Sequence, residues 1–91
     1  MNNNHLNVSR ISSGGTAKVS ASKGKVIYIT AIQNGHTSEA DVTFADNALL
    51  DAVTVGRHNA ISLIAPIVCN SFTPGHAKIS VFYSEGAGSG N

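Results

Sequence analysis

The 91-residue chain has little charge, one cysteine and no tryptophan. Asp, Glu, Lys and Arg together make up 12% of its residues, about half the usual share for a soluble domain. The six Lys and Arg residues are scattered singly and the net charge is +1, so the chain lacks the basic stripe of a nucleic-acid-binding protein. A surface this poor in charge is either wetted by hydroxyls and amides or covered by a partner.

The sequence also has only one cysteine and no long apolar run. Cys69 has no internal disulfide partner, and its apolar neighbours predict a small buried hydrophobe rather than a reactive thiol, which would need a basic neighbour. An unpaired buried thiol suits synthesis in a reducing compartment. No run approaches the roughly 18 apolar residues of a membrane span, and the N-terminus has no apolar signal core. We therefore expect neither membrane insertion nor secretion by a signal peptide.

The chain does have a series of short β-type segments separated by turn residues. Apolar and polar residues alternate within them, and Gly, Asn or Pro stands at most breaks, which predicts strands. The predicted strands are 6–11, 16–21, 25–33, 39–45, 49–55, 60–65, 67–73 and 77–84. The fifth could instead be a short helix capped by Asp46, but its β-branched residues favour a strand. Pro66 is expected to mark a strand end, a sheet edge or a kink.

This pattern predicts an all-β fold, a small antiparallel β-sandwich or jelly-roll-like barrel of seven to eight short strands. We expect a single β domain over residues 6–84. A polar N-terminal arm, 1–5, and a Gly/Ser tail, 85–91, are both expected to be flexible.

Two of the predicted strands carry more apolar residues than one core face needs. Segment 25–33 is apolar on both sides, with Val26, Tyr28 and Ile32 assigned to one face and Ile27, Ile29 and Ala31 to the other. Such a strand is either covered on both faces or meets another subunit on one of them.

Segment 77–84 likewise places Phe82 opposite a face that carries Ile79 and Val81. Large outward residues of this kind either pack under the N-terminal segment or mark an interface between subunits, and we favour the interface. The interface candidates are therefore Ile29, Tyr28 and Phe82, joined by three amides of the polar arm, Asn2, Asn3 and Asn4.

Three histidines fall in predicted turns: His36 in NGHTS, His58 in GRHN and His76 in PGH. If successive strands alternate in direction, these turns lie at one end of the domain. Three neutral imidazoles converging there could bind Zn²⁺ or Ni²⁺. Their spacing matches no ligand motif, and exposed turn histidines need no ligand. The prediction is therefore that no metal is bound, with these three residues as the candidates if one is.

The sequence contains no recognisable catalytic pattern. Asp41, Asp46 and Asp51 are five residues apart, with nothing that builds a cleft around a carboxylate pair, and no Ser stands in a strand–turn–helix setting. We predict a protein that is not an enzyme and binds no cofactor.

Two stretches, KVIYITAIQNGHTSEADVTFADN and HAKISVFYSEG, resemble small virion proteins of tailed bacteriophages. The resemblance covers most of residues 25–86. Members of that group are β-sandwich or jelly-roll-like proteins that decorate or cement capsids, commonly as trimers, or form adhesion modules. It implies a homotrimer that docks on the major capsid protein, lies on the virion surface and is made in the host cytoplasm. The N-terminal arm would then reach over a neighbouring subunit.

The predicted function is therefore that of a non-enzymatic structural protein, a capsid decoration or cement protein. The alternative is a carbohydrate- or receptor-binding adhesion module of a virion, with loops 34–38 and 56–59 as its site. Sugar sites usually stack an aromatic ring on the sugar, and here the Tyr and Phe residues fall in strands rather than loops. This distribution favours the structural role.

Overall fold

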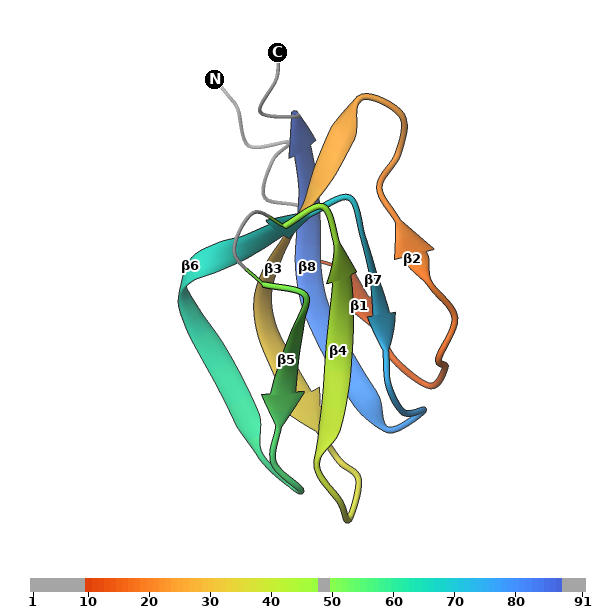
Figure 1. The fold of residues 1–91 in the computed structure, drawn as a ribbon, viewed down its shortest axis with the longest axis vertical. Coiled ribbons are helices and arrows are strands. Elements are labelled where there is room, and N and C mark those ends of the chain that lie inside the picture. The colour runs from red at the N-terminus through yellow and green to blue at the C-terminus, as the bar shows by residue number, and fades with distance from the viewer. Residues whose placement is uncertain (1–9, 48–49, 88–91) are drawn as a thin grey trace.

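The computed structural model describes residues 10–47 and 50–87. Within them the chain forms eight strands and no helix, in two antiparallel sheets of four strands each (Figure 1). The strands are β1 (Arg10–Ser12), β2 (Val19–Ser20), β3 (Lys25–Asn34), β4 (Ala40–Ala45), β5 (Ala52–Val55), β6 (Ala60–Cys69), β7 (Ser71–Pro74) and β8 (Ile79–Ala87).

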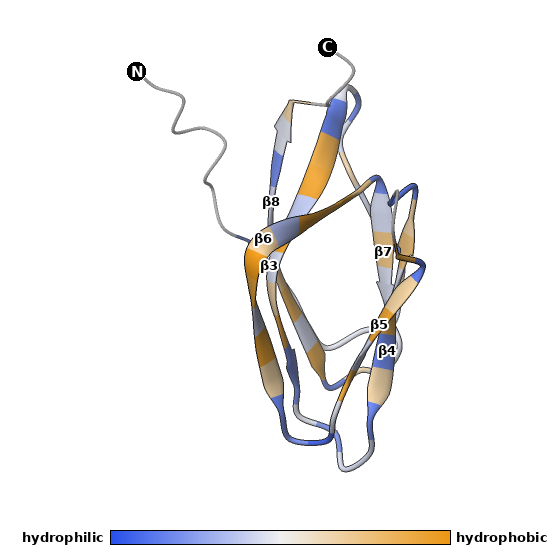
Figure 2. Ribbon diagram, turned by 60° about the vertical axis from the view of Figure 1, so that its left-hand side comes forward, coloured by the Kyte–Doolittle hydropathy of each residue, from blue (hydrophilic) through white to orange (hydrophobic). Residues whose placement is uncertain are grey.

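One sheet has the strand order β1-β8-β3-β6 and the other has the order β2-β7-β4-β5. We call them the β3 sheet and the β4 sheet. They lie face to face as two layers and do not close into a barrel (Figure 2). The all-β prediction is confirmed in its β-sandwich form, and the fifth segment is a strand rather than a helix.

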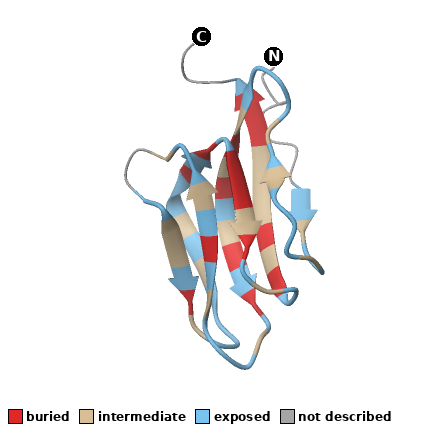
Figure 3. Cartoon of the chain, turned by 45° about the vertical axis from the view of Figure 1, so that its right-hand side comes forward, coloured by how far each residue is buried: buried red, intermediate tan, exposed pale blue. Residues whose placement is uncertain are grey.

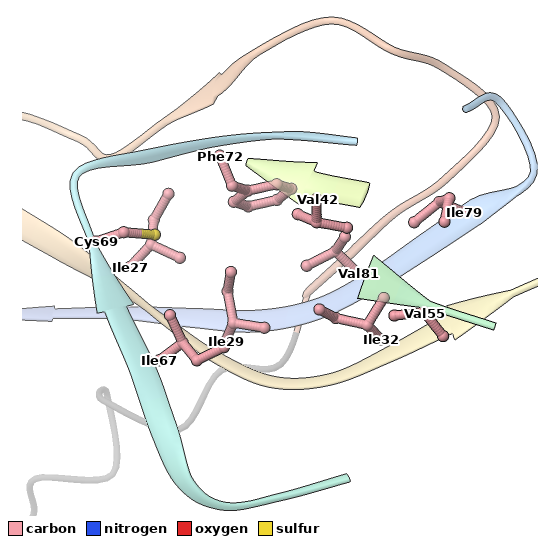
Figure 4. Packing of buried hydrophobic residues seen from close by; sticks show 10 residues of the cluster. All are labelled: Ile27, Ile29, Ile32, Val42, Val55, Ile67, Cys69, Phe72, Ile79 and Val81. Carbon is pink, nitrogen blue, oxygen red and sulfur yellow. The ribbon is translucent and has the colours of Figure 1, made fainter. Parts of the chain in front are cut away.

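The core lies between the two layers. Buried and exposed residues alternate along the strands, so each sheet presents one apolar face to the other (Figure 3). The buried hydrophobic residues are Ile27, Ile29, Ile32, Val42, Val55, Ile67, Cys69, Phe72, Ile79 and Val81 (Figure 4). Full burial of each large side chain is worth about 1.5–3 kcal/mol. The predicted burial of Cys69 is confirmed.

A β-bulge in β3 changes which side chains enter the core. The pairing of β3 with β8 and with β6 shifts register between Ile29 and Ala31. An extra residue at a bulge reverses the alternation beyond it. Ile32 is therefore fully buried with Ile27 and Ile29, and Ala31 pairs with outward-facing Phe82. The predicted faces of Ala31 and Ile32 were wrong for this reason.

Strand β6 passes through Pro66, where the sequence predicted a break between two strands. β6 is an edge strand, and its pairing with β3 skips from Ile67 to Ser62. An edge and a bulge are the places where a sheet tolerates a residue without an N–H. Pro66 therefore marks an edge, one of the expected alternatives.

The strand ends instead at Asn70, where the chain passes from the β3 sheet to the β4 sheet. Backbone bonds hold this corner: Asn70 N–H donates to Ala45 O over 3.0 Å and Ala21 N–H donates to Asn70 O over 2.9 Å. The predicted single strand 67–73 was wrong, because its two halves lie in different sheets. Cys69 and Phe72 can both point into the core as a result.

The C-terminal end of the predicted domain differs from expectation, and the predicted N-terminal arm lies outside the described residues. β8 continues to Ala87, so Glu85 and Gly86 are buried strand residues rather than part of a flexible tail. The arm 1–5, with Asn2, Asn3 and Asn4, and the tail residues 88–91 fall outside the described part of the chain.

Candidate functional site

The turns β3–β4, β5–β6 and β7–β8 lie at one end of the sandwich, the lower end in Figure 1. They carry His36, His58 and His76, and the structure brings these three together. The rings of His36 and His76 stack with centroids 3.6 Å apart and planes 11° apart. The backbone N–H of His58 donates to the carbonyl of His36 over 3.2 Å. We call these three residues the histidine cluster.

Asn34 organises this end from inside. Its side chain is buried, and its Nδ2 donates to the carbonyls of Ser38, Val55 and Gly56 at 3.0, 2.9 and 3.2 Å. Its Oδ1 accepts the backbone N–H of His36 over 2.8 Å. The bond to His36, two residues further on, is the bond that Asn side chains commonly make within a turn. The bonds to Val55 and Gly56 join this turn to the β5–β6 turn. The sequence placed Asn34 at the start of a predicted turn but did not reveal that its side chain links two turns.

Gly75 brings the β7–β8 turn close to β4. A Cβ at Gly75 would overlap the carbonyl oxygen of Asp41, so no larger residue fits without movement of the backbone. The approach leaves an open hollow of about 440 Å³ beside the histidine cluster. The hollow is lined by His36, Glu39, Ala40, Asp41, Gly75 and His76.

The geometry of the histidine cluster does not favour a metal ion. Imidazole lone pairs lie in the ring plane, so two parallel rings 3.6 Å apart do not direct them at one point. Nδ1 of His76 already accepts the N–H of Lys78 over 3.1 Å. Within the described residues, no group of three or more His, Cys, Asp or Glu side chains is placed to hold a metal.

The cluster has a polar, basic environment. The pKa of His36 is lowered, first by desolvation in the turn. Positive charge at His76, Lys78 and His58 lowers it further. Around the hollow, Glu39 and Asp41 are exposed, and Asp41 accepts a hydrogen bond from the hydroxyl of Thr54. The lining holds acids and bases but no nucleophilic hydroxyl or thiol.

The two sheets differ sharply on their outer surfaces. Outward positions of the β3 sheet include five large hydrophobic residues, which we call the apolar outer face: Ile11, Val26, Tyr28, Val68 and Phe82. Register places Ile11 opposite Phe82 and Val68 opposite Tyr28. Ile11 is 60% exposed and Val68 36%. Tyr28 and Phe82, two of the predicted interface residues, therefore lie on one surface.

Ile29, the third of the predicted interface residues, does not lie on that surface. Its side chain is fully buried in the core between the sheets (Figure 4). The prediction for Ile29 was wrong because successive residues of a strand point to opposite faces, and Tyr28 takes the outer one.

Glu85 is a structural residue that the sequence did not single out. Its Oε2 accepts a hydrogen bond from Arg10 Nη1 over 3.2 Å, and its Oε1 accepts the N–H of Ser22 over 2.8 Å. The Ser22 bond, more than the charges of Arg10 and Lys25, lowers the pKa of this carboxyl against the opposing effect of burial. Glu85 thus fastens β1 and the β2–β3 turn to β8.

Cys69 has no sign of reactivity. Burial raises the pKa of its thiol to about 11, so the thiolate is scarce at neutral pH. No helix among the described residues has the length and apolarity needed to cross a membrane.

Comparison of the chain with protein-family models, with curated proteins and with solved structures found no match.

Proposed function

We propose that the protein is a non-enzymatic structural module that associates with copies of itself and docks on a larger protein shell. The shell to which the sequence resemblance points is the capsid of a tailed bacteriophage, with the major capsid protein as partner. The protein would then lie on the capsid surface after synthesis in the host cytoplasm.

The apolar outer face carries this proposal. A sandwich needs one apolar face on each sheet to form its core, and here the outer face of the β3 sheet also carries five large hydrophobic residues, which stand among polar residues such as Thr30 and Gln33. Contiguous apolar patches on small soluble domains mark surfaces that a partner covers. The low charge of the whole chain agrees with a protein that works in an assembly.

Catalysis finds less support in the geometry. Catalytic acids and bases usually sit in clefts that exclude water, whereas Glu39 and Asp41 are exposed beside an open hollow. The thiol of Cys69 is buried in the core. These features are those of a folded scaffold.

A carbohydrate-binding module is the second candidate, favoured by one observation. Tyr28 and Phe82 lie half-buried on an outer face that also carries the exposed Thr30 and Gln33. Aromatic rings beside hydroxyls and amides can stack on sugars and bond to them. The loops 34–38 and 56–59 hold no such ring.

The test is co-sedimentation of the purified full chain with tailed-phage capsids that lack their decoration protein, and a glycan array run in parallel. We expect the chain to pellet with capsids in a saturable manner and to leave the array unbound. Saturable glycan binding without capsid binding would make the carbohydrate module the function. Failure on both would overturn the docking role.

A further inference from the structure

We propose that the apolar outer face is a self-complementary interface through which two copies of this chain stack, sheet on sheet, as a two-fold dimer. The proposal rests on the self-association argued above and names the surface, the partner and the number of copies. It differs from the trimer that the sequence resemblance implies.

The large hydrophobic residues of the face are distributed over all four strands of the β3 sheet. One row runs from Ile11 through Phe82 to Ala31, and a second joins Ser84, Tyr28 and Val68. Two aromatic rings stand near the middle of the sheet, on the adjacent central strands β3 and β8. Large anchors surrounded by smaller neighbours are the usual composition of an interface centre.

The β4 sheet of the same molecule shows what a solvent-facing surface looks like here. Its outward residues are small or polar: Ser20, Asp41, Thr43, Ala45, Ala52, Thr54 and Thr73. Asp41 and Thr54 bond to each other across the strands. The same chain therefore builds one outer sheet face without large hydrophobic residues and another on which they stand among polar residues such as Thr30, Gln33 and Ser62.

Charge points to a second copy as the occupant. The outward positions of β1, β3, β6 and β8 carry no Asp, Glu, Lys or Arg; Arg10 lies on the same side of its sheet as Tyr83 and Glu85. A two-fold axis sets each surface against itself, so any charge near it would meet its own kind. A face without charge avoids that repulsion, whereas nothing on it offers an ion pair to a charged partner.

The size of the face agrees with a dimer of modest affinity. β3, β6 and β8 are 10, 10 and 9 residues long. At the usual strand spacing and rise they cover about 15 Å by about 30 Å, or roughly 450 Å² for each copy. Two copies then cover roughly 900 Å², below the about 1,000 Å² that stable specific interfaces usually exceed, so the dimer should be weak and transient. Face-to-face stacking uses each surface once and closes at two copies.

The test is light scattering on the full chain over a range of concentrations. We expect twice the chain mass at high concentration and the mass of one chain on dilution. Phe82→Glu places a charge at the centre of the face and should weaken dimerisation at least tenfold. Thr43→Glu places the same charge on the polar outer surface of the β4 sheet and should leave the dimer unchanged.

Circular dichroism of each variant separates lost assembly from lost folding. If Phe82→Glu unfolds, Val68→Glu on edge strand β6 makes the same test at a more exposed site. A trimer, or a dimer that survives both charges in folded protein, would overturn the inference and leave the docking function standing. A monomer that binds capsids through Phe82 would show that the capsid protein, not a second copy, covers the apolar outer face. That result would also overturn the inference.

Discussion

Single residues in this small sandwich have effects that depend on which side of a strand they take. Ile29 and Thr30 are neighbours in β3, yet Ile29 is fully buried and Thr30 is exposed at the bulge. A sequence alternation identifies the two faces of such a strand. It does not say which face the other sheet covers, because that depends on residues far away in the chain.

Ile29→Asp should prevent folding. An isolated carboxylate in a dry core costs several kcal/mol, a large part of the ~5–15 kcal/mol that stabilises a domain. Thr30→Asp is the matched control, because it adds the same charge one residue away at an exposed site. We expect native-like circular dichroism only for the control. A soluble, folded Ile29→Asp protein would show that this side chain is not in the core.

The stack of His36 on His76 should make stability depend on pH. The pKa of His36 is lowered in the folded protein from the ordinary 6.5, so the unfolded chain binds more protons in the window just below 6.5. The stabilisation by neutral His36 is therefore complete above pH 6.5. It is lost as the pH falls from 6.5 through the lowered pKa of the folded state.

Thermal unfolding between pH 7.5 and pH 5 checks this expectation. The melting temperature of the wild type should fall with pH, and His36→Gln should flatten the part of the slope that begins near pH 6.5. Lys18→Gln, at a lysine for which the structure shows no link to the cluster, serves as the control. Identical slopes in His36→Gln and the wild type would contradict a role for the stack.

At the scale of elements, the sequence predicted where most strands lie but not how some of them are connected. β3, β4, β5 and β8 lie within or close to their predicted ranges, because alternation and turn residues act over a few positions. The passage of β6 through Pro66 and the change of sheet at Asn70 depend on an edge position and on backbone bonds to distant residues. Local patterns contain neither.

The C-terminal half of β8 shows the same limit. Residues 85–87 have the composition of a flexible tail. Glu85 is nevertheless held by Arg10, 75 positions away, and by Ser22, 63 positions away. These contacts bring buried strand structure to a segment whose own residues favour none. They also join β1 and the β2–β3 turn to the body of the sandwich.

Glu85→Gln should destabilise the protein at neutral pH and much less in acid. The pKa of Glu85 is lowered from 4.5, so its carboxylate stabilises the fold fully above pH 4.5 and loses that effect as the pH falls through the lowered value. Loss of charge-assisted hydrogen bonds should cost roughly 1–3 kcal/mol at pH 7.

Urea unfolding at pH 7 and pH 3 measures this effect. Glu39→Gln, a change at an exposed carboxylate, should leave the free energy of unfolding nearly unchanged at either pH. If Glu85→Gln lowers the free energy of unfolding equally at pH 7 and pH 3, the charge on Glu85 contributes nothing to stability.

At the scale of the whole molecule, the large apolar residues fall into two sets. One set fills the space between the sheets, and the other lies on the outer side of the β3 sheet. A chain of 91 residues has a small core, so the apolar outer face, which we propose is used for association, is a large part of its structure. This is why we place the working surface on a sheet face rather than in the hollow beside the histidine cluster.

The sequence by itself determined the all-β fold, the positions of most strands and the placement of three histidines in turns. It also placed Phe82 opposite Val81 and Cys69 in an apolar setting. These features follow from alternation, turn chemistry and composition, which act between near neighbours.

The tertiary structure alone decided four other matters. They are the reversal of faces at the β3 bulge, the crossing between sheets at Asn70, the fastening of β8 by Glu85 and the stacking of His36 on His76. Each depends on groups that are distant in the chain and adjacent in space. Such contacts form only when two sheets pack and their pairing registers are set, and no local pattern of residues specifies that register.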